Sequence, residues 1–147
     1  MAEERITVEV VTPERAVLSE EVDEVVLPGA EGQVGVLPGH LPLLTSLSIG
    51  EMIVRDGGSE RHFFVDKGFA EVLDDRVSVL TKGCEGISEI DIEKAKDELA
   101  VAEEEIERLE AKAEGAEAEE ELLQRYRDSL KRARIRLLVA EETEESA

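Results

Sequence analysis

The chain has 147 residues, enough for one ordinary domain or for a small domain with an appendage. Apolar residues make up 41% of the sequence, which suffices for a compact core, whereas aromatic residues make up only 3%, too few for a platform that stacks single-stranded nucleic acid. The formal net charge of −20 repels phosphate backbones, so we expect no nucleic-acid partner.

The sequence carries no targeting or membrane signal. Residues Met1 to Arg5 are acidic and lack the basic and apolar regions of a signal peptide, and no stretch approaches the roughly 18 apolar residues of a membrane helix. Cys84 is the one cysteine, which excludes an internal disulfide and fits a reducing cytoplasm. We therefore expect a soluble cytoplasmic protein that reaches a membrane only through a partner, without inserting into it.

The first 86 residues have the pattern of short strands. Ile6, Val8 and Val10 alternate with polar residues, the period of a half-buried strand. Further short apolar segments follow at Val22, Val25–Leu27, Val34–Leu37, Ile53–Val54, Phe63–Val65, Val72–Leu73 and Val77–Leu80. Turn signals separate them at Pro28-Gly29, Pro38-Gly39, Asp56-Gly57-Gly58 and Asp74-Asp75. Many short strands at this spacing predict an all-β sandwich or flattened barrel.

The segment after Gly86 is helical in pattern, with two apolar stripes at alternating steps of three and four residues. The first stripe is Ile92, Ala95, Leu99, Ala102, Ile106, Leu109 and Ala113, and the second is Leu123, Tyr126, Leu130, Ala133, Leu137 and Ala140. Gly115 lies between them at the expected reversal, and Ser88 with Asp91 resembles a capping box at the start. The prediction is an antiparallel two-helix hairpin over 87–147, after a β domain over 1–86; the fold class is α+β.

The expected apolar contact between the two helices of this hairpin, its seam, buries little area. Several stripe positions are alanines, which bury little area at roughly 25 cal/mol per Å². We therefore expect the hairpin to need the β domain or a partner to hold one arrangement, and to be able to adopt another.

The two predicted helices of the hairpin differ in charge. Residues 89–121 contain fifteen acids and four basic residues, a net charge of −11, whereas 125–136 have a net charge of +5. The basic residues of the second helix are Arg125, Arg127, Lys131, Arg132, Arg134 and Arg136. They either pair with the acidic first helix or form a docking face for an acidic partner, and both apply if the hairpin opens.

Nothing in the sequence indicates an enzyme acting alone. Two histidines, His40 and His62, and a single cysteine give no metal-ligand spacing, so no metal site is expected. The glycines from Gly29 to Gly39 do not follow the spacing of a phosphate loop and are better explained by turns, and Cys84 is expected to be a small packed thiol. A small hydrolase using His40 and a carboxylate is the enzymatic alternative.

Three separated segments resemble the epsilon subunits of bacterial F-type ATP synthases. They are Leu27–Gly29 with Gly32–Leu44, Gly68–Val72 with Val77–Leu80, and Leu130–Leu137 with Val139–Glu141. Together they cover almost the whole chain in order. The resemblance implies a non-catalytic rotor subunit whose sandwich binds the gamma subunit and rests on the c-ring, at the cytoplasmic face of the cell membrane. An unrelated β-sandwich adaptor with a partner-binding hairpin is the alternative.

The resemblance also implies roles for the hairpin. In this family it lies folded on the sandwich or extends into the catalytic alpha/beta hexamer and impedes ATP hydrolysis. The six basic residues of the second helix are the expected inhibitory contact.

Some bacterial members bind ATP between the two helices as a regulatory ligand, not as a required cofactor. The corresponding residues here are Glu85, Asp91, Lys94, Ala95, Arg132 and Arg136. Lys94 stands where the family motif has Arg, and lysine lacks the bidentate guanidinium contact, so weaker affinity is expected. Alternatively, Asp91 simply caps the helix and Lys94 is solvated.

Overall fold

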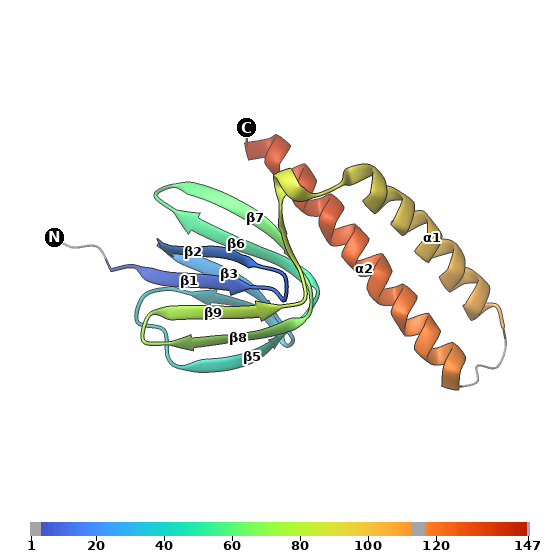
Figure 1. Cartoon of the computed structure of the whole chain (residues 1–147), viewed down its shortest axis with the longest axis horizontal. Coiled ribbons are helices and arrows are strands. Elements are labelled where there is room, and N and C mark those ends of the chain that lie inside the picture. The colour runs from blue at the N-terminus through green and yellow to red at the C-terminus, as the bar shows by residue number, and fades with distance from the viewer. Residues whose placement is uncertain (1–3, 113–116, 147) are drawn as a thin grey trace.

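The computed structural model describes residues 4–112 and 117–146, in which a β domain is followed by two helices (Figure 1). The strands are β1 (Ile6–Val11), β2 (Ala16–Val22), β3 (Glu24–Gly29), β4 (Gly32–Val36), β5 (Leu43–Leu47), β6 (Gly50–Asp56), β7 (Ser59–Val65), β8 (Gly68–Leu73), β9 (Arg76–Thr81) and β10 (Cys84–Gly86). A 3₁₀ turn, η1 (Ile87–Glu89), leads to α1 (Ile92–Glu110) and α2 (Glu117–Ser146). The predicted α+β class, a sandwich or flattened barrel before two helices, is confirmed.

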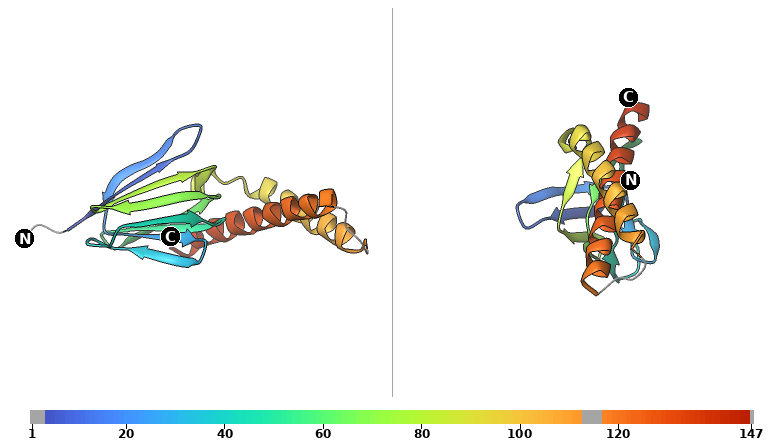
Figure 2. Two further views of the ribbon diagram at one scale, coloured as in Figure 1. Left: turned by 90° about the horizontal axis from the view of Figure 1, so that it is seen from below. Right: turned by 90° about the vertical axis from the view of Figure 1, so that its right-hand side faces the viewer.

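The strands form one hydrogen-bonded sheet that folds over itself into two layers (Figures 1 and 2). Its order is β10-β7-β6-β3-β5-β8-β9-β1-β2, with β4 on β3. The two layers are joined where β3 meets β5 at Gly29 and Leu47. Most pairs are antiparallel, but β1 lies parallel to β9. The sheet is thus nearly closed, which leaves few open edges.

The alternating residues of the predicted strands supply the core. Ile6, Val8 and Val10 are completely buried, as the period-2 pattern predicts. Leu27, Met52 and other aliphatic residues from both layers join them in one cluster. This core makes the β domain a rigid base.

Three of the four predicted turns are confirmed and one is displaced. At Pro38-Gly39, Gly39 has a positive φ and the backbone nitrogen of His40 donates to the carbonyl of Leu37 at 3.1 Å. Gly57 and Gly58 both have positive φ in the β6–β7 hairpin, and Asp74 and Asp75 do so in the β8–β9 hairpin. The turn predicted at Pro28-Gly29 is wrong, because β3 continues through Gly29 and pairs with Gly32 of β4.

Strands β5 and β10 are absent from the predicted pattern. The side chains of β5 are partly buried or exposed apart from Leu47, and β10 has three residues, so neither leaves a clear apolar signal. The last strand ends at Gly86.

The helices lie side by side and antiparallel, with α2 between α1 and the β domain (Figure 1). Of the two stripes, Ala95, Ala102, Leu109 and Ala133 are buried. Ile92 is 42% exposed, so its assignment to the seam was wrong; it lies at the first position of α1. The predicted reversal at Gly115 and the stripe residue Ala113 lie outside the described residues.

The cap of α1 also differs from the prediction. Asp91 is the N-cap residue and its carboxylate accepts a hydrogen bond from the backbone nitrogen of Lys94 at 3.0 Å. Ser88 lies in the preceding 3₁₀ turn instead of capping α1. The alternative that Asp91 caps the helix is confirmed.

Candidate functional site

A face of α2 that lies largely outside the predicted stripe packs on the β domain. Val139 of α2 is buried against Phe64 of β7, Ile49 and Ile90, with Ile135 and Ala140 at the margin. Phe64 points away from the sandwich core, which holds its neighbours Phe63 and Val65. We call this contact between α2 and the β domain the hairpin dock. Its apolar part is a cluster separate from the sandwich core.

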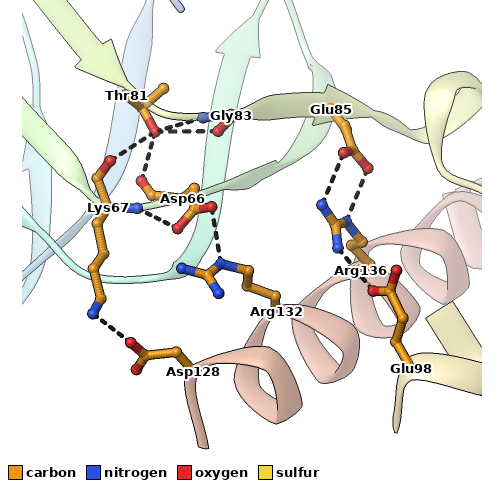
Figure 3. Close-up of polar contacts among 9 residues, drawn as sticks. All are labelled: Asp66, Lys67, Thr81, Gly83, Glu85, Glu98, Asp128, Arg132 and Arg136. Atoms are coloured by element: carbon orange, nitrogen blue, oxygen red, sulfur yellow. Dashed lines mark hydrogen bonds and ion pairs between the residues drawn. The ribbon is translucent and has the colours of Figure 1, made fainter. Parts of the chain in front are cut away.

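Arg136 is the central polar contact of the hairpin dock. Its Nε and Nη2 donate to the two carboxylate oxygens of Glu85, both at 3.1 Å, and its Nη1 lies 3.4 Å from Glu98 of α1 (Figure 3). Its guanidinium carbon lies 4.3 Å from the ring centre of Phe64. One side chain thereby connects β10, α1 and β7 to α2, by a bidentate ion pair and a cation–π contact.

Two further ion pairs join α2 to the turn between β7 and β8. Arg132 Nε donates to Asp66 Oδ2 at 2.9 Å, and Lys67 Nζ donates to Asp128 Oδ2 at 2.6 Å (Figure 3). Burial acts to raise the pKa of Asp128, but the hydrogen bonds from Lys67 and Gln124 prevail and hold that pKa below its ordinary value. Asp128 is therefore ionised at neutral pH and keeps its attraction for Lys67.

Thr81 holds this turn in position. Its buried hydroxyl donates to the carbonyl of Asp66 at 2.6 Å and accepts from the backbone nitrogen of Gly83 at 3.3 Å (Figure 3). The backbone nitrogen of Asp66 also donates to the carbonyl of Gly83 at 2.9 Å. These hydrogen bonds hold the β7–β8 turn against the β9–β10 turn. They thereby position Asp66 and Lys67, the two charged residues that contact α2.

The basic residues of α2 fall into two groups. Arg132 and Arg136 are half-buried in the hairpin dock, and Arg127 pairs with Glu110 of α1 at 3.0 Å. Arg125, Lys131 and Arg134 are exposed and have no ion pair within 4–112 and 117–146. Pairing within the chain therefore accounts for only part of the basic helix.

The residues predicted to hold ATP are mostly brought together. A pocket of about 220 Å³ is lined by Glu85, Glu89, Asp91, Lys94, Ala95, Glu98 and Arg136. Arg132 does not line it, because that side chain is turned to Asp66. Four carboxylates thus face two cations, and Arg136 is already engaged with two of those carboxylates.

His62 lies among carboxylates beside the C-terminal part of α2, and sequence reasoning missed this group. His62 is 6% exposed, and its Nδ1 lies 3.1 Å from Glu51 and its Nε2 3.2 Å from Glu60. Glu142 of α2 lies 4.0 Å from Nε2. The continuous apolar run Phe63–Val65 beside His62 was the available signal, because a strand covered on both faces loses its alternation.

Among the described residues, neither His40 nor Cys84 forms a hydrogen bond or ion pair with a carboxylate. The His40 ring contacts the carbonyl oxygen of Leu41 at 2.6 Å. Cys84 is buried, as expected of a packed thiol, and burial raises the pKa of its thiol to about 12. Over the described ranges, no group of three or more ligating side chains could hold a metal ion, and no helix is long and apolar enough to span a membrane.

Comparison with known proteins agrees with this architecture. The sequence model of a family described as ATP synthase, Delta/Epsilon chain, beta-sandwich domain matches residues 5–87. The ATP synthase epsilon chain of Geotalea uraniireducens is 44% identical over 137 residues, which are 93% of this chain and 94% of that one.

Two solved structures share the fold. One is a chain in the mitochondrial ATP synthase of Euglena gracilis, described as OSCP/F1/c-ring, with a TM-score of 0.66 and 24% identity over 98% of this chain and 82% of that chain. The other belongs to the central stalk and c-ring of the Tetrahymena thermophila mitochondrial ATP synthase, with a TM-score of 0.61 and 14% identity over 95% and 99%. By its family match and its relative, this chain belongs to the ATP synthase epsilon family and is a non-catalytic subunit of that enzyme.

Proposed function

We propose that this chain is a rotor subunit that couples the catalytic hexamer to the c-ring and restrains ATP hydrolysis through its hairpin. It works at the cytoplasmic face of the cell membrane as part of the complex. The observation that carries the regulatory part is the hairpin dock, in which three ion pairs follow one another along α2 beside a small apolar cluster. Contacts of this kind are exchangeable for contacts with another charged surface, so the hairpin has two alternative partners.

The sandwich offers an uncovered apolar row for the gamma subunit. Phe69, Leu80 and Val11 are neighbours across β8, β9 and β1, and they are 59%, 59% and 38% exposed. They line a groove of about 630 Å³. An exposed apolar groove on a rigid sheet fits a helical shaft protein, because it buries apolar area without rearrangement of the sheet.

The gamma contact is tested by titrating gamma with variants of the full chain. We expect Phe69→Ala with Leu80→Ala to weaken gamma binding by at least about tenfold, the effect of losing central apolar anchors. Leu138→Ala, at an exposed leucine on α2, is the matched control and should leave binding unchanged. Equal binding by all three proteins would refute the assignment of this face.

In the released state, α2 presents its whole basic face. Arg132 and Arg136 leave their carboxylate partners and join the exposed Arg125, Lys131 and Arg134. Acidic loops of the catalytic subunits then replace Asp66 and Glu85 as partners. The hairpin inserted in the hexamer obstructs the rotation that ATP hydrolysis drives.

The test is the ATPase activity of the assembled enzyme with the full chain and with a chain ending at Ile87. We expect the truncated enzyme to assemble normally and to hydrolyse ATP faster. Unchanged hydrolysis with normal assembly would contradict the inhibitory role and leave the coupling role standing.

We also propose that ATP binds only weakly in the pocket between the helices and favours the docked hairpin. The pocket volume of about 220 Å³ is below the roughly 300 Å³ of ordinary small-molecule sites, and carboxylates outnumber cations in its lining. Calorimetry with millimolar ATP should show a weak, saturable heat that Lys94→Arg strengthens. No heat and no rise in melting temperature would exclude the site.

A further inference from the structure

A groove between α2 and the sandwich gathers several cationic side chains of this acidic protein. It has a volume of about 500 Å³ and is lined by Lys67, Lys82, Leu122, Arg125, Tyr126, Asp128, Ser129 and Arg132. Four cations face one carboxylate here, in a chain whose net charge is −20. We call it the anion groove. It shares no lining residue with the pocket predicted for ATP.

Only part of this positive charge is compensated by neighbouring carboxylates. Lys67 pairs with Asp128, and Arg132 uses only its Nε on Asp66, which leaves both terminal nitrogens without a partner among the described residues (Figure 3). Lys82 and Arg125 are exposed and form no ion pair within the described ranges. The groove therefore has donors to spare, and they come from two separate elements.

These donors match a phosphate-type anion. A guanidinium with two free terminal nitrogens can donate two parallel hydrogen bonds to one tetrahedral oxyanion. Lysine adds a point charge, and the hydroxyls of Tyr126 and Ser129 are further donors. The cavity is concave and both its walls belong to this chain, which suits a small anion better than a protein segment.

We propose that the anion groove binds a phosphate-type anion and that the bound anion clamps α2 onto the sandwich. The source is free phosphate or pyrophosphate, whereas a nucleotide belongs to the separate pocket proposed for ATP. Lys67 and Lys82 come from the sandwich, whereas Arg125 and Arg132 come from α2, so the complete site exists only while the hairpin is docked. At an anion concentration ten times Kd, the ratio of docked to released chains rises about elevenfold. The regulatory meaning of this clamp rests on the proposed function, but the binding itself does not.

The binding is tested by amide NMR titration of the full chain with phosphate, pyrophosphate and ATP, each against sodium chloride at the same ionic strength. We expect saturable shifts at the groove with phosphate or pyrophosphate, and at least a tenfold loss of affinity in Lys82→Ala with Arg125→Ala. Neither residue takes part in an ion pair of the hairpin dock, so this variant should fold. The matched control is Lys131→Ala with Arg134→Ala, which removes the same charge elsewhere on α2.

Three outcomes would overturn the proposal. If the native chain shows no saturable shift, the site is excluded. If both double variants lose the same affinity for the anion, net charge alone explains the binding. Binding of ATP alone, unaffected by Lys82→Ala with Arg125→Ala, assigns the ligand to the other pocket. The ATPase comparison with the chain ending at Ile87 is independent of these results, so the groove and the inhibitory role fail separately.

The clamp is tested by attaching a donor and an acceptor dye to exposed Glu31 and Lys112 in the full chain. Saturating phosphate should narrow the distance distribution toward the docked value, and Lys82→Ala with Arg125→Ala should remove that response. A distribution unchanged by bound anion would refute the clamp.

Discussion

The sandwich and the hairpin are held together in different ways. The sandwich has one continuous cluster of buried aliphatic side chains contributed by both layers. Among the described residues of α1 and α2, the buried ones are Ala95, Ala102, Leu109, Ala133 and Val139, three of which are alanines. Because alanine buries little apolar area, the seam between the helices contributes little free energy by itself.

Because of this difference, we expect the sandwich and the hairpin to differ in their local stability. Apolar burial is non-directional and is lost only when the sandwich unfolds, whereas the ion pairs of the hairpin dock can be lost locally. We therefore expect the hairpin to open at a lower free energy than that of global unfolding, while the sandwich unfolds as one cooperative unit. The comparison can be tested by weakening each region separately.

The largest expected effect is in the sandwich core. Leu27 is completely buried, so Leu27→Ala should lower the free energy of unfolding by about 2–5 kcal/mol. Denaturant unfolding of the isolated chain measures it. Leu44→Ala is the matched control, because that leucine is 71% exposed and the change should cost less than about 0.5 kcal/mol. A similar loss in both variants would mean that burial does not decide stability here.

A smaller and local effect is expected at the hairpin dock. Arg136→Ala leaves Glu85 without its bidentate partner and removes the contact with Phe64. It should weaken docking by about 1–3 kcal/mol, the range for charged hydrogen bonds in a partly exposed site. Hydrogen exchange should show faster exchange at β10 and η1, with the core strands unchanged.

Arg134→Ala controls for the lost charge on α2, because Arg134 is exposed and lies outside the hairpin dock. Its exchange rates should match those of the native chain. If Arg136→Ala accelerated exchange in the core strands as well, the hairpin dock and the sandwich would be one cooperative unit and the comparison would fail.

Sequence reasoning reached the fold because each region has its own periodicity. Alternation at Ile6, Val8 and Val10 predicted strands, and steps of three and four residues predicted the helical seam. What it missed is the contact between the regions. Val139 is buried on the sandwich although it lies outside the predicted stripe, because α2 has two apolar neighbours and a single stripe describes only one of them.

For the same reason, the sequence predicted some residues of the candidate sites and missed others. Glu85, Asp91 and Arg136 were found because the family motif contains them, and the structure gathers them in one pocket. Asp66 and Thr81 follow no such pattern, since a turn residue becomes important only when a distant helix lies against it. Contacts between segments that lie far apart in the sequence leave no local periodicity to detect.

The smallest expected effect concerns pH. Burial raises the pKa of Glu51 in the hairpin dock, although His62 acts to lower it. The protonated form is therefore favoured by folding, and its contribution to stability is present at acid pH and is lost as the pH rises through the raised pKa. At neutral pH the ionised Glu51 also faces Glu60 of β7 and Glu142 of α2 around the same imidazole. Carboxylates of like charge oppose docking here.

Glu51→Gln removes this titration and keeps an oxygen that can accept from the His62 ring. We expect it to stabilise the docked chain at pH 7 by about 0.5 kcal/mol, and to lose that advantage near pH 4, where glutamates become protonated. Melting temperatures over this range measure the effect. Glu107→Gln removes one exposed acid from α1 and serves as control, because it reports only the general relief of the −20 charge. A gain at pH 7 no greater than that of Glu107→Gln would show that Glu51 is as well solvated as a surface glutamate, and that the end of α2 does not respond to its ionisation.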